Sequence, residues 1–152
     1  KQKSKNKNKK MYKKYFLKKI KITNNQIYKI STDNKSLRES AEDYEKIIRK
    51  YFLNKKVSFD LILLGLGKDG HIASLFKKNV NKKIHKNVDF LKRKDFSRIT
   101  LTLKCLNNSK SIFLWAPGIK KIKKVEKILM DNTNKYPASF LKEKGKFLFH
   151  CY

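Results

Sequence analysis

The sequence predicts an α/β fold with a mostly parallel sheet and helices on both of its faces. Three observations support this prediction. A continuous apolar run at 59–66 (FDLILLGL) is typical of a strand buried on both faces. A second apolar run at 111–117 (SIFLWAP) stops at a Pro-Gly pair. Apolar residues with helical spacing lie between the strands, and alternation of strands and helices favours parallel pairing.

The first elements precede the apolar strand. Residues 1–9 are expected to be a disordered basic tail. Helical spacing begins at Met11 and continues to Ile20. Residues 26–30 (QIYKI) are expected to form a short strand. The predicted order up to this point is therefore tail, helix and strand.

A longer helix is expected next. Ser36 and Glu39 match a capping box, in which the Ser oxygen accepts a free helix N–H and the Glu reaches back. The helix should run to about Asn54. Its apolar face consists of Leu37, Ala41, Tyr44, Ile47, Ile48, Tyr51 and Phe52.

The remaining elements follow the apolar strand. A short helix is expected from His71, and the Lys- and Asn-rich segment 77–97 is interpreted as a connection. Residues 98–103 (RITLTL) alternate and predict a strand end followed by a turn or helix. After the second apolar strand, Ile122, Val125, Ile128 and Leu129 have helical spacing, and 146–151 (KFLFHC) predicts a last strand.

The composition is strongly basic, with 40 Lys and Arg against 12 Asp and Glu and a formal charge of +28. Such a charge suggests nucleic acid or an anionic membrane surface as a partner. However, Lys far outnumbers Arg, the residue that usually reads bases and phosphates with two hydrogen bonds. Abundant Lys, Asn, Ile and Tyr also follows from an AT-rich genome. Nucleic-acid binding therefore remains an alternative hypothesis rather than the main one.

The apolar runs and the cysteines bear on compartment and redox state. No apolar run approaches the ~20 residues needed to span a bilayer. The two cysteines, Cys105 and Cys151, form no disulfide framework and are expected to be reduced and buried. A cytoplasmic protein without a membrane partner is expected.

The stretch 65–76 (GLGKDGHIASLF) offers three interpretations. Its first residues fit G-x-G-x-x-G, but a dinucleotide site needs an acidic residue about 20 positions later, and Asp89 lies in a Lys-rich segment. A purely structural turn is the second interpretation, with Asp69 capping the following helix. The third is a catalytic loop that presents His71 at the carboxyl end of a buried strand.

The stretch closely resembles the G-x-G-x-DGH-x-ASLF signature of the 6-phosphogluconolactonases. Further similarities lie at 96–107 (FSRITLTLKCLN), 114–121 (LWAPGIKK) and 136–139 (YPAS). The sister family, the glucosamine-6-phosphate deaminases, shares the DGH but continues with Ala-Phe-Asn-Glu. Here Phe76 stands at the position of that Glu, which favours the lactonase over the deaminase.

The resemblance implies hydrolysis of 6-phosphogluconolactone to 6-phosphogluconate, in the oxidative pentose phosphate pathway. His71 is expected to act as the general base, because a neutral imidazole can remove a proton from water near physiological pH. Asp69 is expected to orient His71 or the substrate hydroxyls. Gly67 and Gly70 let the backbone approach the sugar. No cofactor is implied, and the three histidines show no metal-ligand spacing.

The substrate's phosphate needs cations. The resemblance implies Arg98 and Lys121 for this role, with Lys120 as a neighbouring competitor to the second. The family's Gly-Gly-Ser-Thr phosphate loop and Asp-Glu-Arg segment are not found in this sequence. Residues 10–152 are therefore expected to be the C-terminal two-thirds of a lactonase-like domain whose N-terminal part is missing. A fused or associated glucose-6-phosphate dehydrogenase is a further possibility that the resemblance raises.

Overall fold

The structure is a computed structural model of the 152-residue chain. The described residues are 13–31, 36–80, 83–92, 97–118, 123, 125–128, 130, 134–141 and the backbone of 147–150. The predicted disordered tail at 1–9 lies outside them, as do Lys121 and Cys151.

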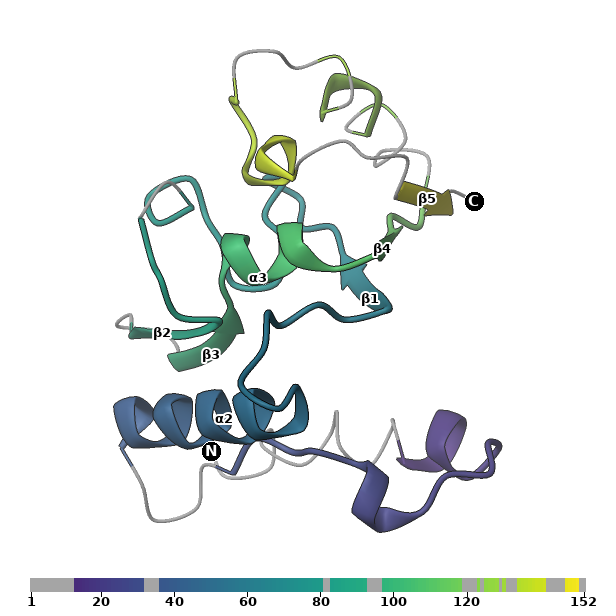
Figure 1. The fold of residues 1–152 in the computed structure, drawn as a ribbon. Helices are drawn as coiled ribbons and strands as arrows, with labels where there is room; N and C mark the ends of the chain where they lie inside the picture. The colour runs from purple at the N-terminus through teal and green to yellow at the C-terminus, as the bar shows by residue number, and fades with distance from the viewer. Residues whose placement is uncertain are drawn as a thin grey trace.

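A parallel three-stranded sheet forms the centre of the fold. It consists of β1 (Leu61–Gly65), β4 (Ser111–Trp115) and β5 (Phe147–His150), in the order β1-β4-β5. All of its pairings are parallel, and Leu63 of β1 lies opposite Phe113 of β4. These strands lie side by side near the right of Figure 1. The strands predicted at 59–66, 111–117 and 146–151 and the parallel α/β class are therefore confirmed.

The two faces of β1 have different environments. Ile62 and Leu64 point into the core, which buries them almost completely. Leu61 and Leu63, on the other face, are 54% and 55% exposed, and Trp115 of β4 is 47% exposed. The prediction that this strand is buried on both faces is thus wrong for one face. The core on the buried side also contains Leu66, Ile72, Leu75, Val80, Leu106, Ile112, Leu114, Ala116, Val125, Ile128, Ala138 and Leu141.

A separate layer consists of an antiparallel ribbon and a helix. Strands β2 (Val88–Lys92) and β3 (Ser97–Leu101) pair with each other, and α2 (Leu37–Tyr51) packs against both. Figure 1 shows α2 running alongside the ribbon. The interpretation of 77–97 as a plain connection is wrong, because it contains β2. One strand of this ribbon, β3, is hydrogen-bonded to the segment that follows β1, through Thr100 and Ser74.

The N-terminus of α2 has the predicted cap. The Ser36 hydroxyl accepts a hydrogen bond from the Glu39 N–H at 3.2 Å, and the Glu39 carboxylate accepts one from the Ser36 N–H at 2.7 Å. Both groups satisfy N–H donors that the first helical turn cannot use internally. The capping box in the sequence is therefore confirmed.

A buried carboxylate joins α2 to β2. Glu45 accepts hydrogen bonds from the backbone N–H groups of Asn87 and Val88, both at 2.8 Å. It also accepts bonds from the Asn87 amide at 2.9 Å and from Arg49 at 2.8 Å. Burial alone raises the pKa of Glu45, but the hydrogen bonds outweigh it and hold this pKa below its ordinary value. The helix is thereby fixed to the start of the ribbon.

Two predictions for the N-terminal segment are wrong. Residues 26–30 form no strand; a single 3-10 turn, η3 (Asn24–Gln26), is followed by irregular backbone. The helix predicted from Met11 is reduced, in the described residues, to a π-helical turn, η2 (Lys13–Leu17), that buries no side chain. The Tyr44 hydroxyl donates to the Tyr28 carbonyl at 3.4 Å, so side-chain contact with α2 replaces sheet pairing in this segment.

The strand β3 leads directly into a short helix, as predicted. Thr102 caps α3 (Leu103–Asn108) by accepting a hydrogen bond from the Cys105 N–H at 3.2 Å. Cys105 is fully buried, and burial raises its pKa to about 12, so it is an inert thiol. Val125 and Ile128 are helical and buried, as their spacing predicts. A short 3-10 helix, η4 (Pro137–Phe140), completes the described elements.

None of the helices in the described part of the chain combines the length and the apolar character needed to cross a bilayer.

Candidate active site

The loop after β1 folds back on itself to form a closed turn. The Gly70 N–H donates to the Gly67 carbonyl at 3.0 Å, and the Gly67 N–H donates to the His71 carbonyl at 2.8 Å. Leu66 and Ile72 form an antiparallel bridge at the base of the turn. Because Leu66 also donates to the Trp115 carbonyl, the turn is anchored to the carboxyl ends of both β1 and β4.

The helix predicted from His71 is absent. Ala73 takes a φ of 49°, in the left-handed region, and this turns the chain instead of continuing it as a helix. Ile72 then bridges to Leu75, and both side chains are buried in the core. Asp69 consequently has no helix to cap. The loop is held by tertiary contacts of its apolar residues, which local sequence pattern does not reveal.

Gly70 has a conformational and a steric reason to be glycine. Its φ of +82° is unfavourable for residues with a side chain. A Cβ there would lie 3.0 Å from the Tyr136 ring. The Gly70 carbonyl also accepts a hydrogen bond from the Ala138 N–H at 3.0 Å. The segment 136–139 therefore supports the turn, a role that the sequence comparison alone did not assign to Tyr136.

Gly67 lies directly against the imidazole of His71. A Cβ on Gly67 would come within 2.1 Å of His71 Nδ1 and 2.2 Å of its Cε1. Atoms at such distances overlap, so any side chain at position 67 would displace the ring. The sequence predicted that Gly67 lets the backbone approach the ligand. The structure adds a second reason for glycine here, the close contact of Gly67 with the His71 ring.

His71 and Asp69 form a close pair. His71 Nδ1 lies 2.5 Å from Asp69 Oδ1, which also accepts a hydrogen bond from the His71 N–H at 3.3 Å. Burial alone raises the pKa of Asp69, but the hydrogen bonds from His71 hold this pKa below its ordinary value. An ionised carboxylate only accepts hydrogen bonds, so the proton of a neutral imidazole lies on Nδ1. Nε2 is then the nitrogen that can accept a proton.

The pair remains accessible to solvent. The side chain of His71 is 32% exposed and that of Asp69 is 61% exposed. Water can therefore reach the imidazole. This arrangement suits a general base better than a histidine buried for structural reasons.

The predicted cation Arg98 lies on the ribbon beside this loop. It is exposed on β3, two residues before Thr100, so alternation places both side chains on the same face of the strand. The Thr100 hydroxyl accepts a hydrogen bond from the Ser74 N–H at 3.1 Å, which connects β3 to the loop after His71. Lys121 lies outside the described residues. The structure thus brings four predicted site residues into one turn and Arg98 onto a neighbouring strand.

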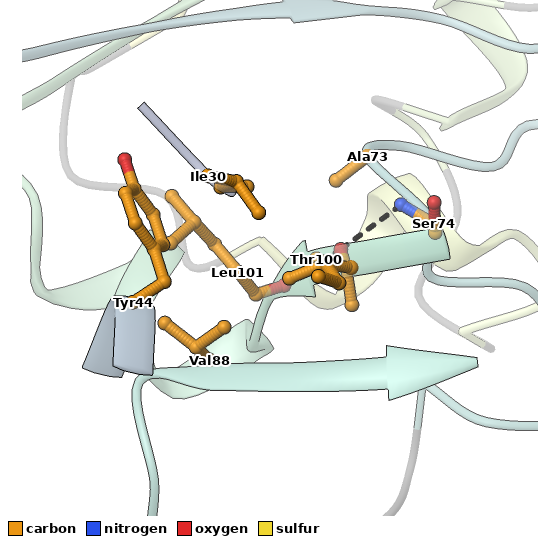
Figure 2. A pocket seen from close by; sticks show the side chains of 8 residues that line it. Ile30, Tyr44, Ala73, Ser74, Val88, Thr100 and Leu101 are labelled. Carbon is orange, nitrogen blue, oxygen red and sulfur yellow. Dashed lines mark hydrogen bonds between the residues drawn. The ribbon is translucent and has the colours of Figure 1, made fainter. Parts of the chain in front are cut away.

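An apolar pocket of about 220 Å³ lies behind the loop. Figure 2 shows Ser74 joined to Thr100 at one side of it, with Ile30 and Tyr44 at the other. The other residues that line it are Ala73, Val88, Ile99 and Leu101. Neither Asp69 nor His71 is among its lining residues, and a lining this apolar does not match a sugar phosphate.

Within the described ranges, no three side chains of His, Cys, Asp or Glu gather in a way that could hold a metal ion. The acid–base character of this site comes from the pair formed by Asp69 and His71. An imidazole whose tautomer is fixed by a carboxylate can accept a proton and return it, which is the chemistry of general acid–base catalysis.

The chain matches a known protein family over almost its whole length. The family model "Glucosamine-6-phosphate isomerases/6-phosphogluconolactonase" matches residues 1–149. The chain belongs to this family. A probable 6-phosphogluconolactonase of Oryza sativa subsp. japonica is 34% identical over 131 residues, which is 78% of this chain and 44% of the rice protein. The 6-phosphogluconolactonase of Homo sapiens is 31% identical over 137 residues, or 86% of this chain and 53% of the human protein.

A solved structure shows the same fold. The 6-phosphogluconolactonase of Thermotoga maritima superimposes with a TM-score of 0.73 at 31% identity, covering 89% of this chain and 60% of the bacterial chain. The chain spans about half the length of the curated relatives it matches. Family membership and fold therefore hold for the described portion, and the resemblance seen in the GLGKDGHIASLF stretch is confirmed.

Proposed function

We propose that the protein hydrolyses 6-phosphogluconolactone to 6-phosphogluconate, a step of the oxidative pentose phosphate pathway. The observation that carries the proposal is the Asp69–His71 pair at the end of β1. The names of the relatives support the same reaction, since the rice and human proteins are both called 6-phosphogluconolactonases.

The first step is attack of water on the lactone carbonyl. Asp69 holds the Nδ1–H of His71, so Nε2 carries the lone pair that removes a proton from the attacking water. The oxygen of that water bonds to the carbonyl carbon, and the carbonyl oxygen becomes an oxyanion. His71 is then an imidazolium, and the negative charge of Asp69 stabilises it.

The second step breaks the ring. The oxyanion re-forms the carbonyl, the bond from carbon to the ring oxygen breaks, and the imidazolium returns its proton to that oxygen. The products are the open-chain acid and a neutral His71. One water molecule is consumed and no other reactant is needed, so a single histidine serves as base and then as acid.

Binding of the substrate is assigned to backbone and cations. Gly67 and Gly70 keep the turn free of side chains, so its backbone can approach the sugar. Arg98 is proposed to bind the phosphate with its forked guanidinium. Lys121 is proposed as a second cation on the strength of the sequence resemblance alone.

The test is direct. The longest natural form of the protein that contains this chain is incubated with 6-phosphogluconolactone, and release of acid is followed against the spontaneous rate. We expect saturable hydrolysis that His71→Ala slows by on the order of 100-fold or more, and saturable calorimetric binding of 6-phosphogluconate. Hydrolysis no faster than in buffer would contradict the proposal.

Two finer points complete the proposal. We place the reaction in the cytoplasm, and we retain association with a glucose-6-phosphate dehydrogenase as a hypothesis. Cell fractionation checks the first point. Measuring dehydrogenase activity and mass of the native protein after size-exclusion chromatography checks the second. A fully active lactonase with neither the mass nor the activity of a dehydrogenase would rule out the association.

A further inference from the structure

We propose that Phe76 is a positioning residue for His71, and this inference rests on the proposed lactonase function. The centres of the two rings lie 4.6 Å apart, with an angle of 34° between their planes. This is the distance range of favourable contact between aromatic rings. Among the described residues, Phe76 thus contacts the imidazole in addition to Asp69 at Nδ1 and the backbone of Gly67.

Phe76 is half-buried, and its ring contacts His71. The half-buried hydrophobic residues packed against the main core, among those the structure describes, are Phe59, Leu101, Leu103, Tyr136 and Phe140. Phe76 is absent from that set and from the set around the second core cluster, although its own side chain is half-buried. Its ring contact with His71 therefore lies outside the two core clusters of the described residues.

The backbone of Phe76 is fixed on both sides by Asn79. The Phe76 N–H donates to Asn79 Oδ1 at 2.6 Å, and the Asn79 side-chain amide donates to the Ser74 carbonyl at 3.2 Å. The Phe76 carbonyl accepts hydrogen bonds from the N–H groups of Asn79 and Val80, both at 2.9 Å. Asn79 and Val80 are themselves buried. The direction of the aromatic side chain is consequently set by a rigid turn.

The three contacts restrict different motions of the imidazole. The bond to Asp69 determines which nitrogen carries the proton, and Gly67 leaves the space that the ring occupies. Phe76 keeps the ring from tilting and shields part of its face from water. The position of Nε2 relative to the attacking water thus depends on Phe76. A shift of about 1 Å in a reacting group can cost on the order of 100-fold in rate. The contact of the Phe76 ring with the imidazole therefore affects turnover.

Kinetics of Phe76→Leu test this role in the natural form of the protein. The Leu side chain keeps an apolar group at the site and removes the ring. We expect kcat to fall by about tenfold, because the base is less well placed. KM should stay within about threefold, because Phe76 does not bind the phosphate. Phe76→Tyr keeps the ring and should restore most of kcat.

A matched control separates positioning from general loss of packing. Phe90 is another half-buried phenylalanine, on β2, and it packs against the second core cluster. Phe90→Leu should leave kcat unchanged, although it lowers the melting temperature at least as much as Phe76→Leu because Phe90 packs against the core. If Phe76→Leu fails to fold, Phe76→Met provides a more adaptable apolar replacement for the same measurement. Equal kcat values for the wild type and the folded Phe76 variants would overturn the proposal.

A second readout does not depend on activity. The ¹H–¹⁵N spectrum of the imidazole reports which nitrogen of His71 is protonated. We expect Phe76→Leu to let the ring tilt away from Asp69, which weakens the bond that favours the Nδ1–H form, while Phe90→Leu leaves the spectrum unchanged. An altered spectrum in a protein that does not hydrolyse the lactone would reject the proposed function and keep the positioning role. An unaltered spectrum together with unaltered kcat would reject the positioning role and keep the function.

Discussion

Glu45 and Asp69 are two carboxylates of the same chain in contrasting settings. Glu45 is buried, and three groups at the start of β2 and one arginine donate to it. Asp69 is 61% exposed, and His71 donates to it from both its ring and its backbone. Hydrogen bonds hold the pKa of each below its ordinary value. The direction of a pKa shift therefore does not distinguish a structural carboxylate from a functional one.

The identity of the donors makes the distinction. The donors to Glu45 are mostly backbone N–H and amide groups, which cannot change protonation, so the site serves only to join helix and ribbon. The side-chain donor to Asp69 is an imidazole, a group that can accept and return a proton, and it is partly exposed to solvent. A carboxylate whose donors cannot change protonation indicates a structural role. A carboxylate whose donor is an accessible imidazole indicates a candidate site of proton transfer.

The largest expected effect is on catalysis. His71→Ala should lower kcat by on the order of 100- to 10,000-fold, the usual contribution of a general base. Stability should change little, because the Asp69 carboxylate left behind is exposed and remains hydrated. Steady-state kinetics and thermal melting check both parts. Unchanged turnover would remove His71 from the mechanism.

The next effect is on stability. Glu45→Ala leaves the buried N–H groups of Asn87 and Val88 without their acceptor and should cost about 3 kcal/mol of unfolding free energy. Glu42→Ala is the matched control on the same helix. It removes only an exposed ion pair with Lys86 and should cost less than about 1 kcal/mol. Denaturant unfolding measures both; equal losses would show that Glu45 is no more structural than a surface residue.

A smaller effect is expected from Asp69→Asn. The amide keeps the size of the side chain but no longer favours the Nδ1–H form of His71, so kcat should fall by about tenfold. The free energy of unfolding should change by less than for Glu45→Ala, because the side chain is exposed. A large loss of stability without loss of kcat would reverse the assignment of the two carboxylates.

The smallest expected effect is on the stability of the protein at acidic pH. The pKa of Glu45 in the folded state lies below its value of 4.5 in the unfolded chain. Its contribution to stability is therefore complete above pH 4.5 and is lost as the pH falls through the folded-state pKa. Unfolding free energies of the wild type should decline below pH 4.5 more steeply than those of Glu45→Gln. Parallel curves would contradict the contribution of Glu45.

Features encoded by nearby residues are predicted well. The capping box of Ser36 and Glu39, the apolar strands and the turn with Asp69 and His71 all depend on short-range spacing. The resemblance of 65–76 to a known signature indicates the site from sequence alone. The family comparison confirms the resemblance, while the roles of the individual residues stay predictions.

Features that depend on distant contacts are missed. The strand β2 lies in a Lys- and Asn-rich segment, and its pairing with β3 and its tie to Glu45 stabilise it more than its own pattern suggests. The predicted helix at His71 fails because Ile72 and Leu75 enter the core from a turn. Tyr136 reaches Gly70 from a distant part of the chain. None of these contacts leaves a local signal.

Because Gly67 lies so close to His71, the substitutions that are tolerated at one of these positions depend on the residue at the other. A Cβ at position 67 conflicts with the imidazole, whereas a Cβ at position 65 would meet nothing within 4 Å. Gly67→Ala should therefore lower the free energy of unfolding while His71 is present. In the His71→Ala background, which lacks the ring, it should change this free energy very little. The two substitutions are expected to be strongly non-additive. In a lineage that lost the histidine, the glycine would be free to change, so the pair would be kept or lost together.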